Sequence, residues 1–89
     1  MNVTEVRVFL RNGPAKLKAF ANLTLDGSFA VKDLKVVEGR KGLFVAMPAR
    51  KLPGGEFMDV AHPVTREMRD VIQGEVIKAY KKAAAEKDG

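Results

Sequence analysis

The stretch KLKAFANLTLDGSFAVKDLKVV (residues 16–37) decides the fold, because it describes two neighbouring strands and the turn between them. The apolar residues Leu17, Ala19, Ala21, Leu23 and Leu25 alternate with other residues, as they do in a strand that buries one face. Asp26-Gly27 follows at once and predicts a tight hairpin turn, since glycine tolerates a positive φ. The chain therefore contains an antiparallel hairpin at its centre.

The second strand of this hairpin contains a change of phase. Phe29 and Val31 alternate in step, whereas Leu34 and Val36 fall one residue out of step with them. One extra residue in a strand shifts the alternation by one position. We therefore expect a β-bulge near Lys32-Asp33, which would bring all four apolar residues to one face.

Further elements extend outward from this hairpin. Residues 3–10 alternate as a strand does, RNGPA (11–15) carries turn signals, and the apolar run 43–47 ends at Pro48. From Thr65, a suitable N-cap, the apolar spacing becomes helical. The predicted apolar stripe of this helix consists of Met68, Val71, Ile72, Val76, Ala79, Tyr80 and Ala83.

These elements predict an α+β fold with two layers. Its parts are a four-stranded antiparallel meander, an irregular arm between Pro48 and Pro63, and one C-terminal helix packed on the sheet. We expect a single domain over residues 1–85 and a frayed tail over 86–89. One helix covers only one face of a sheet, so apolar residues on the other face predict a homodimer. These residues are Val3, Phe9 and Phe20, with Ile77 opposite the stripe of the helix; scattered surface hydrophobes are the alternative.

Composition narrows the class of protein. The 89 residues carry 16 Lys and Arg against 11 Asp and Glu, a net charge of +5 that favours a polyanionic partner but also occurs in ordinary small proteins. The absence of cysteine excludes a disulfide scaffold, a thiolate metal site and a cysteine nucleophile. Because no apolar run approaches the roughly 20 residues of a membrane span and no secretory signal is visible, we expect a cytoplasmic protein without a membrane partner.

Candidate catalytic residues are few. Glu56, Asp59 and His62 recur every three residues, but on an extended segment this spacing does not place three side chains on one face. His62 is the single histidine, and neither a phosphate-binding glycine loop nor a G-x-S-x-G elbow is present. We therefore expect no enzyme, no cofactor and no metal site, with a catalytic trio as the remaining alternative.

The basic residues offer a stronger candidate site. Arg66 and Arg69 lie in the first turns of the predicted helix, where a positive charge opposes the helix dipole and so suggests a functional reason. The predicted nucleic-acid contacts are Arg40, Lys41, Arg50, Lys51, Arg66, Arg69 and Lys81. Separately, basic and aromatic residues interleave on two neighbouring strands, as Arg7, Phe9, Lys18 and Phe20. They predict either a stacking platform for single-stranded bases or, as we favour, burial in a dimer.

Several segments together resemble the SpoVG family of small bacterial septation and sporulation regulators, from about residue 2 to residue 80. They are VTEVRV (3–8), TLDGSFAVKDLKVVEG (24–39), GLFVAMP (42–48), GEF (55–57) and DVAHP (59–63). The resemblance implies a homodimer with an antiparallel sheet and a C-terminal helix that binds DNA and RNA and regulates gene expression. It places nucleic-acid contacts at Arg66 and Arg69, with Arg50 and Lys51 matching the basic pair of the family.

The chain departs from the family pattern at two places, Met58 and Gly74. A polar or basic residue is common at the first, and a glycine within the helix implies either a kink or a closely packed neighbour. Asn22 and Gln73 are lone candidates for reading bases, so we expect binding through phosphates with little sequence selectivity. The alternative function is a protein-interaction module whose basic surface binds an acidic division or regulatory protein.

Overall fold

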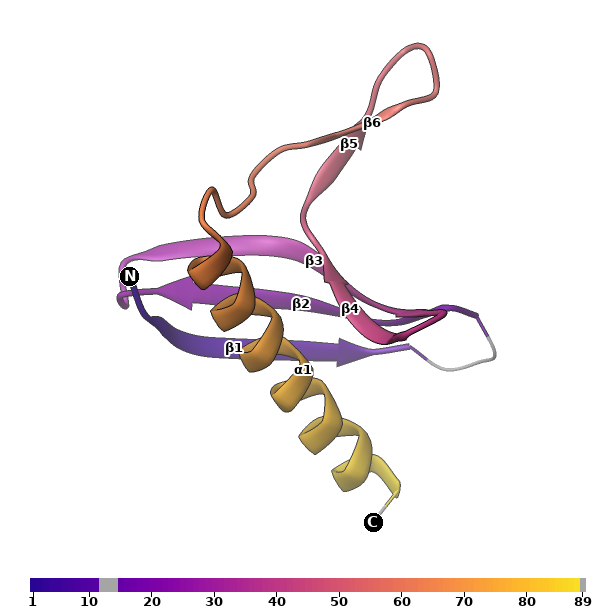
Figure 1. Ribbon diagram of the computed structural model, residues 1–89. Helices are drawn as coiled ribbons and strands as arrows, with labels where there is room; N and C mark the ends of the chain where they lie inside the picture. Colours follow the sequence, from indigo (N-terminus) through magenta and orange to yellow (C-terminus); the bar gives the residue numbers. More distant parts are fainter. Residues whose placement is uncertain (12–14, 89) are drawn as a thin grey trace.

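The structure, a computed structural model that describes residues 1–11 and 15–88, is an α+β fold (Figure 1). Four strands form one antiparallel sheet in the order β1-β2-β3-β4, and the helix α1 follows at the end of the chain. The sheet strands are β1 (Val3–Leu10), β2 (Leu17–Leu25), β3 (Phe29–Gly39) and β4 (Gly42–Ala46). The predicted meander is confirmed, while the predicted turn at 11–15 lies mostly outside the described residues.

The β2–β3 hairpin has the predicted turn. Asp26 and Gly27 have φ values of 51° and 63°, and the Ser28 N–H donates to the Leu25 carbonyl at 2.9 Å. Strand β1 holds this turn in place, because the Gly27 N–H donates to Thr4 Oγ1 at 2.9 Å. Both central residues have the positive φ of a type I′ turn, which suits the twist of the paired strands.

The predicted β-bulge in β3 is also present. The register between β2 and β3 shifts between the pairs Ala21–Leu34 and Leu23–Val31, and Asp33 has a φ of 66°. Asn22 stabilises this conformation, since its Oδ1 accepts the Asp33 N–H at 3.2 Å. As a result, Leu34 is fully buried and Val31 packs against the same core.

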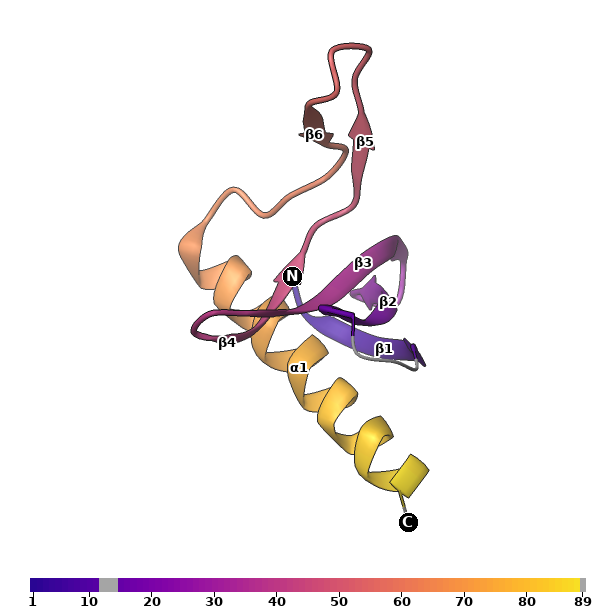
Figure 2. The same cartoon turned by 90° about the vertical axis from the view of Figure 1, so that its right-hand side faces the viewer.

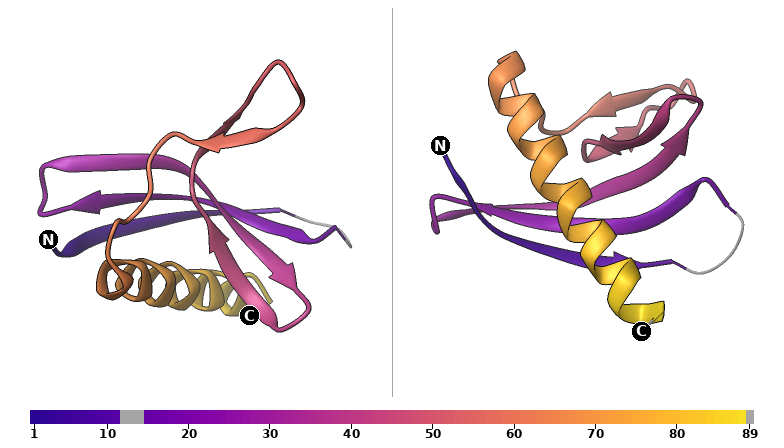
Figure 3. Two further views of the ribbon diagram at one scale, coloured as in Figure 1. Left: turned by 45° about the horizontal axis from the view of Figure 1, so that its top comes forward. Right: turned by 60° about the horizontal axis from the view of Figure 1, so that its bottom comes forward.

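Helix α1 (Arg66–Asp88) lies across one face of the sheet (Figures 2 and 3). Thr65 is its N-cap, with the Met68 N–H donating to Thr65 Oγ1 at 3.1 Å. The core lies between helix and sheet, and its buried residues are Ala19, Ala21, Leu23, Leu25, Leu34, Val36, Val45, Ile72 and Val76. The helix continues over residues 86–88 of the predicted tail, and Gly89 lies outside the described residues. In the described part of the chain, no helix has the length and apolarity needed to cross a membrane.

Two parts of the predicted apolar pattern of the helix are wrong. Val71 was expected in the buried stripe but is 44% exposed, and Ile77 was expected outside it but packs against the core. Successive residues of a helix are 100° apart around its axis. Val71 and Ile77 therefore lie at equal angles on opposite sides of the helix face that is centred between Ile72 and Val76. Which flank is covered depends on how α1 lies on the sheet, and here the flank of Ile77 is the covered one.

Two residues of the sheet also lie on the face opposite to the prediction. The register shifts between Val3 and Glu5, and Val3 packs against the core instead of facing away from it. A second shift lies between Leu17 and Ala19, so that Leu17 pairs with Val37 and is absent from the packed core. Each irregularity reverses the alternation on which the prediction depended.

Within the predicted irregular arm between Pro48 and Pro63, residues 49–59 form a short hairpin that the sequence did not predict. Strand β5 (Ala49–Lys51) pairs antiparallel with β6 (Phe57–Asp59), and Gly55 has a φ of 89° in the turn between them. The Leu52 N–H donates to the Glu56 carbonyl at 2.7 Å and closes this turn. Among the described elements, β5 and β6 pair only with each other, and the arm extends away from α1 (Figure 1).

Candidate functional site

The seven predicted contact residues are all exposed, but they lie on four separate parts of the molecule. Arg40 and Lys41 lie in the β3–β4 turn, Arg50 and Lys51 on β5, Arg66 and Arg69 at the start of α1, and Lys81 near its end. Figure 1 shows the arm, the β3–β4 turn and the C-terminus at three separate ends of the molecule. The fold therefore does not gather these cations into one continuous patch.

The arm separates the side chains of Arg50 and Lys51. Adjacent residues of a strand point to opposite faces, whereas directly paired residues point to the same face. Arg50 pairs with Met58 and Lys51 pairs with Phe57. Lys51 therefore shares a face with Phe57, and Arg50 shares the other face with Met58.

The Phe57 face borders a groove where the arm, the sheet and the helix meet, which we call the arm-base groove. Its volume is about 490 Å³, and its lining residues are Lys35, Phe44, Val45, Ala46, Met47, Ala49, Phe57, Asp59, Arg69 and Gln73. Two cations, Lys35 and Arg69, face one carboxylate, Asp59. Among the described residues, a single ion pair is formed, between Arg7 and Glu5. Lys35 and Arg69 therefore have no ion-pair partner in that part of the chain.

Lys35 is a site residue that the sequence did not reveal. It pairs with Ala46 on β4 and with Phe20 on β2, which places it beside the groove. Its position follows from the bulge at Asp33, after which odd-numbered residues of β3 face away from the core. The phase change in the sequence was the signal from which this position could have been inferred.

The two candidate base-reading amides are engaged within the fold. Asn22 Oδ1 accepts the Asp33 N–H of the bulge, and Gln73 Oε1 accepts the Val45 N–H at 3.2 Å. Reading an adenine by a side-chain amide requires both its oxygen and its nitrogen. Neither amide therefore has both groups free for such a contact.

The possible catalytic trio is not assembled. His62 Nδ1 lies 3.1 Å from the carbonyl of its neighbour Pro63, and Asp59 faces the arm-base groove. Over residues 1–11 and 15–88, no group of three His, Cys, Asp or Glu side chains lies close enough to hold a metal ion. Glu56, Asp59 and His62 are thus three separate exposed residues of the arm and its return segment.

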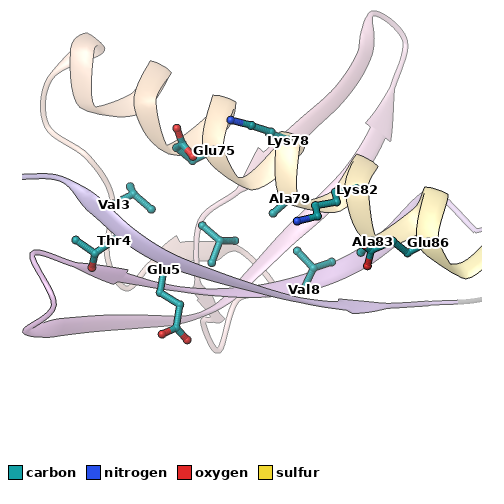
Figure 4. A pocket seen from close by; sticks show the side chains of 11 residues that line it. Val3, Thr4, Glu5, Val8, Glu75, Lys78, Ala79, Lys82, Ala83 and Glu86 are labelled. Atoms are coloured by element: carbon teal, nitrogen blue, oxygen red, sulfur yellow. The ribbon is translucent and has the colours of Figure 1, made fainter.

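A second groove of about 470 Å³ lies between β1 and the later turns of α1 (Figure 4). Lys78 and Lys82 line it, but so do Glu75 and Glu86. These opposite charges on one helix face offset each other in the field that a polyanion would experience. This β1–α1 groove is therefore a poorer phosphate site than the arm-base groove and a useful control surface.

Apart from Arg50, the arm's other side is apolar. Met58 is 53% exposed and points away from the arm-base groove, and Val60 is 67% exposed just beyond β6. Val60 and Phe29, itself 64% exposed, line a shallow hollow of about 300 Å³. Exposed apolar residues that are grouped in this way are typical of a protein–protein contact.

Comparisons with known proteins agree on one family. Residues 1–82 match the model of the SpoVG family. The chain is 48% identical over 88 residues to a protein of Clostridium botulinum (strain Alaska E43 / Type E3), covering 99% of this chain and 97% of that protein. It is 49% identical over 80 residues to a protein of Caldicellulosiruptor saccharolyticus, covering 90% and 91%. Both relatives are named as septation protein SpoVG.

Proposed function

Because the chain belongs to the SpoVG family, we propose that it is a nucleic-acid-binding regulatory protein. It binds DNA and RNA mainly through phosphates and thereby affects gene expression and, in some bacteria, septation or sporulation. The septation names of its relatives support the cellular part of this proposal. The protein acts as a homodimer in the cytoplasm.

The observation that carries the proposal is that two cations line the arm-base groove and neither forms an ion pair within the described part of the chain. Lys35 and Arg69 line it from the sheet and the helix, Lys51 points to the same side of the arm, and Arg66 lies three residues before Arg69. Exposed, unpaired Lys and Arg side chains release counterions from a nucleic-acid backbone when they neutralise its phosphates. Because the side-chain oxygens of Asn22 and Gln73 accept hydrogen bonds within the fold, the protein discriminates little between base sequences.

The remaining predicted contacts extend this site. Arg40 and Lys41 on the β3–β4 turn, Arg50 on the far face of the arm, and Lys81 on α1 lie outside the arm-base groove. A long polyanion reaches such separate cations along its length, and a homodimer presents every one of them twice. These four residues therefore add to the affinity without defining the site.

The apolar side of the arm supports the homodimer. Val3 and Ile77, which the sequence assigned to a partner, are used in the core of the chain itself. Phe29, Met58 and Val60 are exposed instead, and burying them would stabilise a second copy through the hydrophobic effect. The dimer contact therefore lies on the side of the arm that faces away from the arm-base groove.

Fluorescence anisotropy with labelled duplex DNA and single-stranded RNA tests the nucleic-acid proposal. We expect Arg66→Glu/Arg69→Glu to weaken binding of both by about tenfold or more, since two attractive charges become repulsive. Lys78→Glu/Lys82→Glu in the β1–α1 groove changes the net charge equally and should weaken binding much less. Circular dichroism checks that each variant is folded.

Two results would contradict the proposal. Equal losses in the two double variants would mean that net charge, and not this site, determines the affinity. A wild-type protein that binds neither ligand at low salt would rule out nucleic acid, and the basic surface would then face an acidic protein partner.

A further inference from the structure

The face of the sheet opposite α1 carries two phenylalanines side by side. Phe9 on β1 pairs directly with Phe20 on β2, and both point away from the buried residues Ala19 and Ala21. Phe9 is 52% exposed and Phe20 is half-buried. Figure 2 shows α1 on one side of the strands, with the other side of β1 and β2 uncovered by it. We call this second side the open face.

Basic side chains surround the two rings. The guanidinium carbon of Arg11 lies 5.7 Å from the centroid of the Phe20 ring, within the range of a cation–π contact. Lys35 pairs with Phe20 from the other side, and Arg7 lies two residues before Phe9 on the same face. Glu5 also lies on this face, but it forms an ion pair with Arg7.

The positive charge of the open face indicates which kind of partner binds there. In a two-fold symmetric dimer each surface would meet its own copy, and an open face rich in cations would meet cations. A polyanion has the complementary charge. Lys35 also lines the arm-base groove, so the proposed phosphate site continues directly onto the open face beside Phe20.

We propose that Phe9 and Phe20 form a stacking platform for unpaired bases of a single-stranded nucleic acid. This inference rests on the proposed function for the phosphate contacts that anchor the strand in the arm-base groove. Bases of a single strand can stack on exposed aromatic rings, whereas bases in a duplex stack on each other and cannot reach them. The platform accordingly favours single strands over duplexes, with little preference for base identity.

The test compares one single-stranded RNA with a duplex DNA of the same length, using the wild-type chain, Phe9→Leu and Phe20→Leu. Each variant should bind the single strand roughly tenfold more weakly, because one stacked base is lost, and should bind the duplex as the wild type does. Phe9→Tyr retains an aromatic ring and should retain the affinity. Val71→Ala, a change at an exposed apolar residue of α1 outside both proposed surfaces, is the control and should change neither affinity.

An abasic oligonucleotide provides the second measurement. It keeps the phosphates and lacks the bases, so wild type and Phe9→Leu should bind it equally. Unchanged single-strand binding by both phenylalanine variants would overturn the platform while leaving the phosphate site intact. A wild-type chain that binds neither strand nor duplex would overturn both. Phe9 is more than half exposed, so Phe9→Leu keeps the test valid if Phe20→Leu does not fold.

Discussion

At the scale of single residues, two glycines show that the same residue can have opposite effects on stability. Gly74 lies within α1, and a Cβ atom built on it would meet no neighbouring atom within 4 Å. The close neighbour that the sequence suggested is therefore absent, and the helix runs through this position without a break. Gly27 also has open space around it, but its φ of 63° is unfavourable for any residue with a Cβ.

Gly74→Ala should therefore stabilise the protein, and Gly27→Ala should destabilise it. Alanine in a helix interior raises the free energy of unfolding by about 1 kcal/mol relative to glycine. Alanine in the left-handed region lowers it by about 1–2 kcal/mol. Urea denaturation of both variants and the wild type measures the two changes. A Gly74→Ala variant that is less stable than wild type would show that α1 does not pass this residue as a regular helix.

At the scale of elements, the arm has two distinct faces because it is a two-stranded hairpin. Its pairing sends Lys51 and Phe57 to one face and Arg50 and Met58 to the other. An irregular loop would impose no such division. The sequence predicted the position of the arm from Pro48 and its glycines, but its register depends on the turn closed between Leu52 and Glu56.

The apolar side of the arm carries a prediction about assembly. Met58→Gln/Val60→Thr should convert the dimer into a monomer, because both changes remove exposed apolar surface that the second copy would bury. Sedimentation equilibrium should give twice the chain mass of 9.7 kDa for the wild type and the single mass for the variant. Val71→Thr on α1 is the control and should leave the dimer intact. A monomeric wild type would refute the dimer, and a dimeric variant would place its contact elsewhere.

At the scale of the whole molecule, the sequence correctly predicted those structural features that depend on neighbouring residues alone. The Asp26-Gly27 turn, the bulge at Asp33 and the Thr65 N-cap each depend on residues close together in the chain, and all three are confirmed. The errors at Val3 and Ile77 have another cause. They depend on strand register and on helix tilt, which packing across the molecule decides.

The candidate site shows the same limit. Arg69 is recognisable from its place near the helix start, where its charge opposes the dipole. Lys35 becomes a site residue only when β3, β4, the arm and α1 are brought together. Of the seven predicted contacts, Arg69 lines this groove. Lys51 shares the face of the arm that carries Phe57, and Arg66 lies three residues before Arg69 on α1. These relations can be recognised only in the folded chain.

The salt dependence of binding tests the central claim, a phosphate-binding site at the arm-base groove, most directly. The affinity of the wild-type chain for duplex DNA is measured by anisotropy over a series of salt concentrations. Contacts from Lys35, Lys51, Arg66 and Arg69 alone predict a slope of log K against log salt of about −3.6 for one copy, and about twice that when both copies of a dimer bind. The slope is steeper where the four outlying cations also reach phosphates. A slope near zero with binding retained would contradict the claim, because such binding would not depend on phosphates.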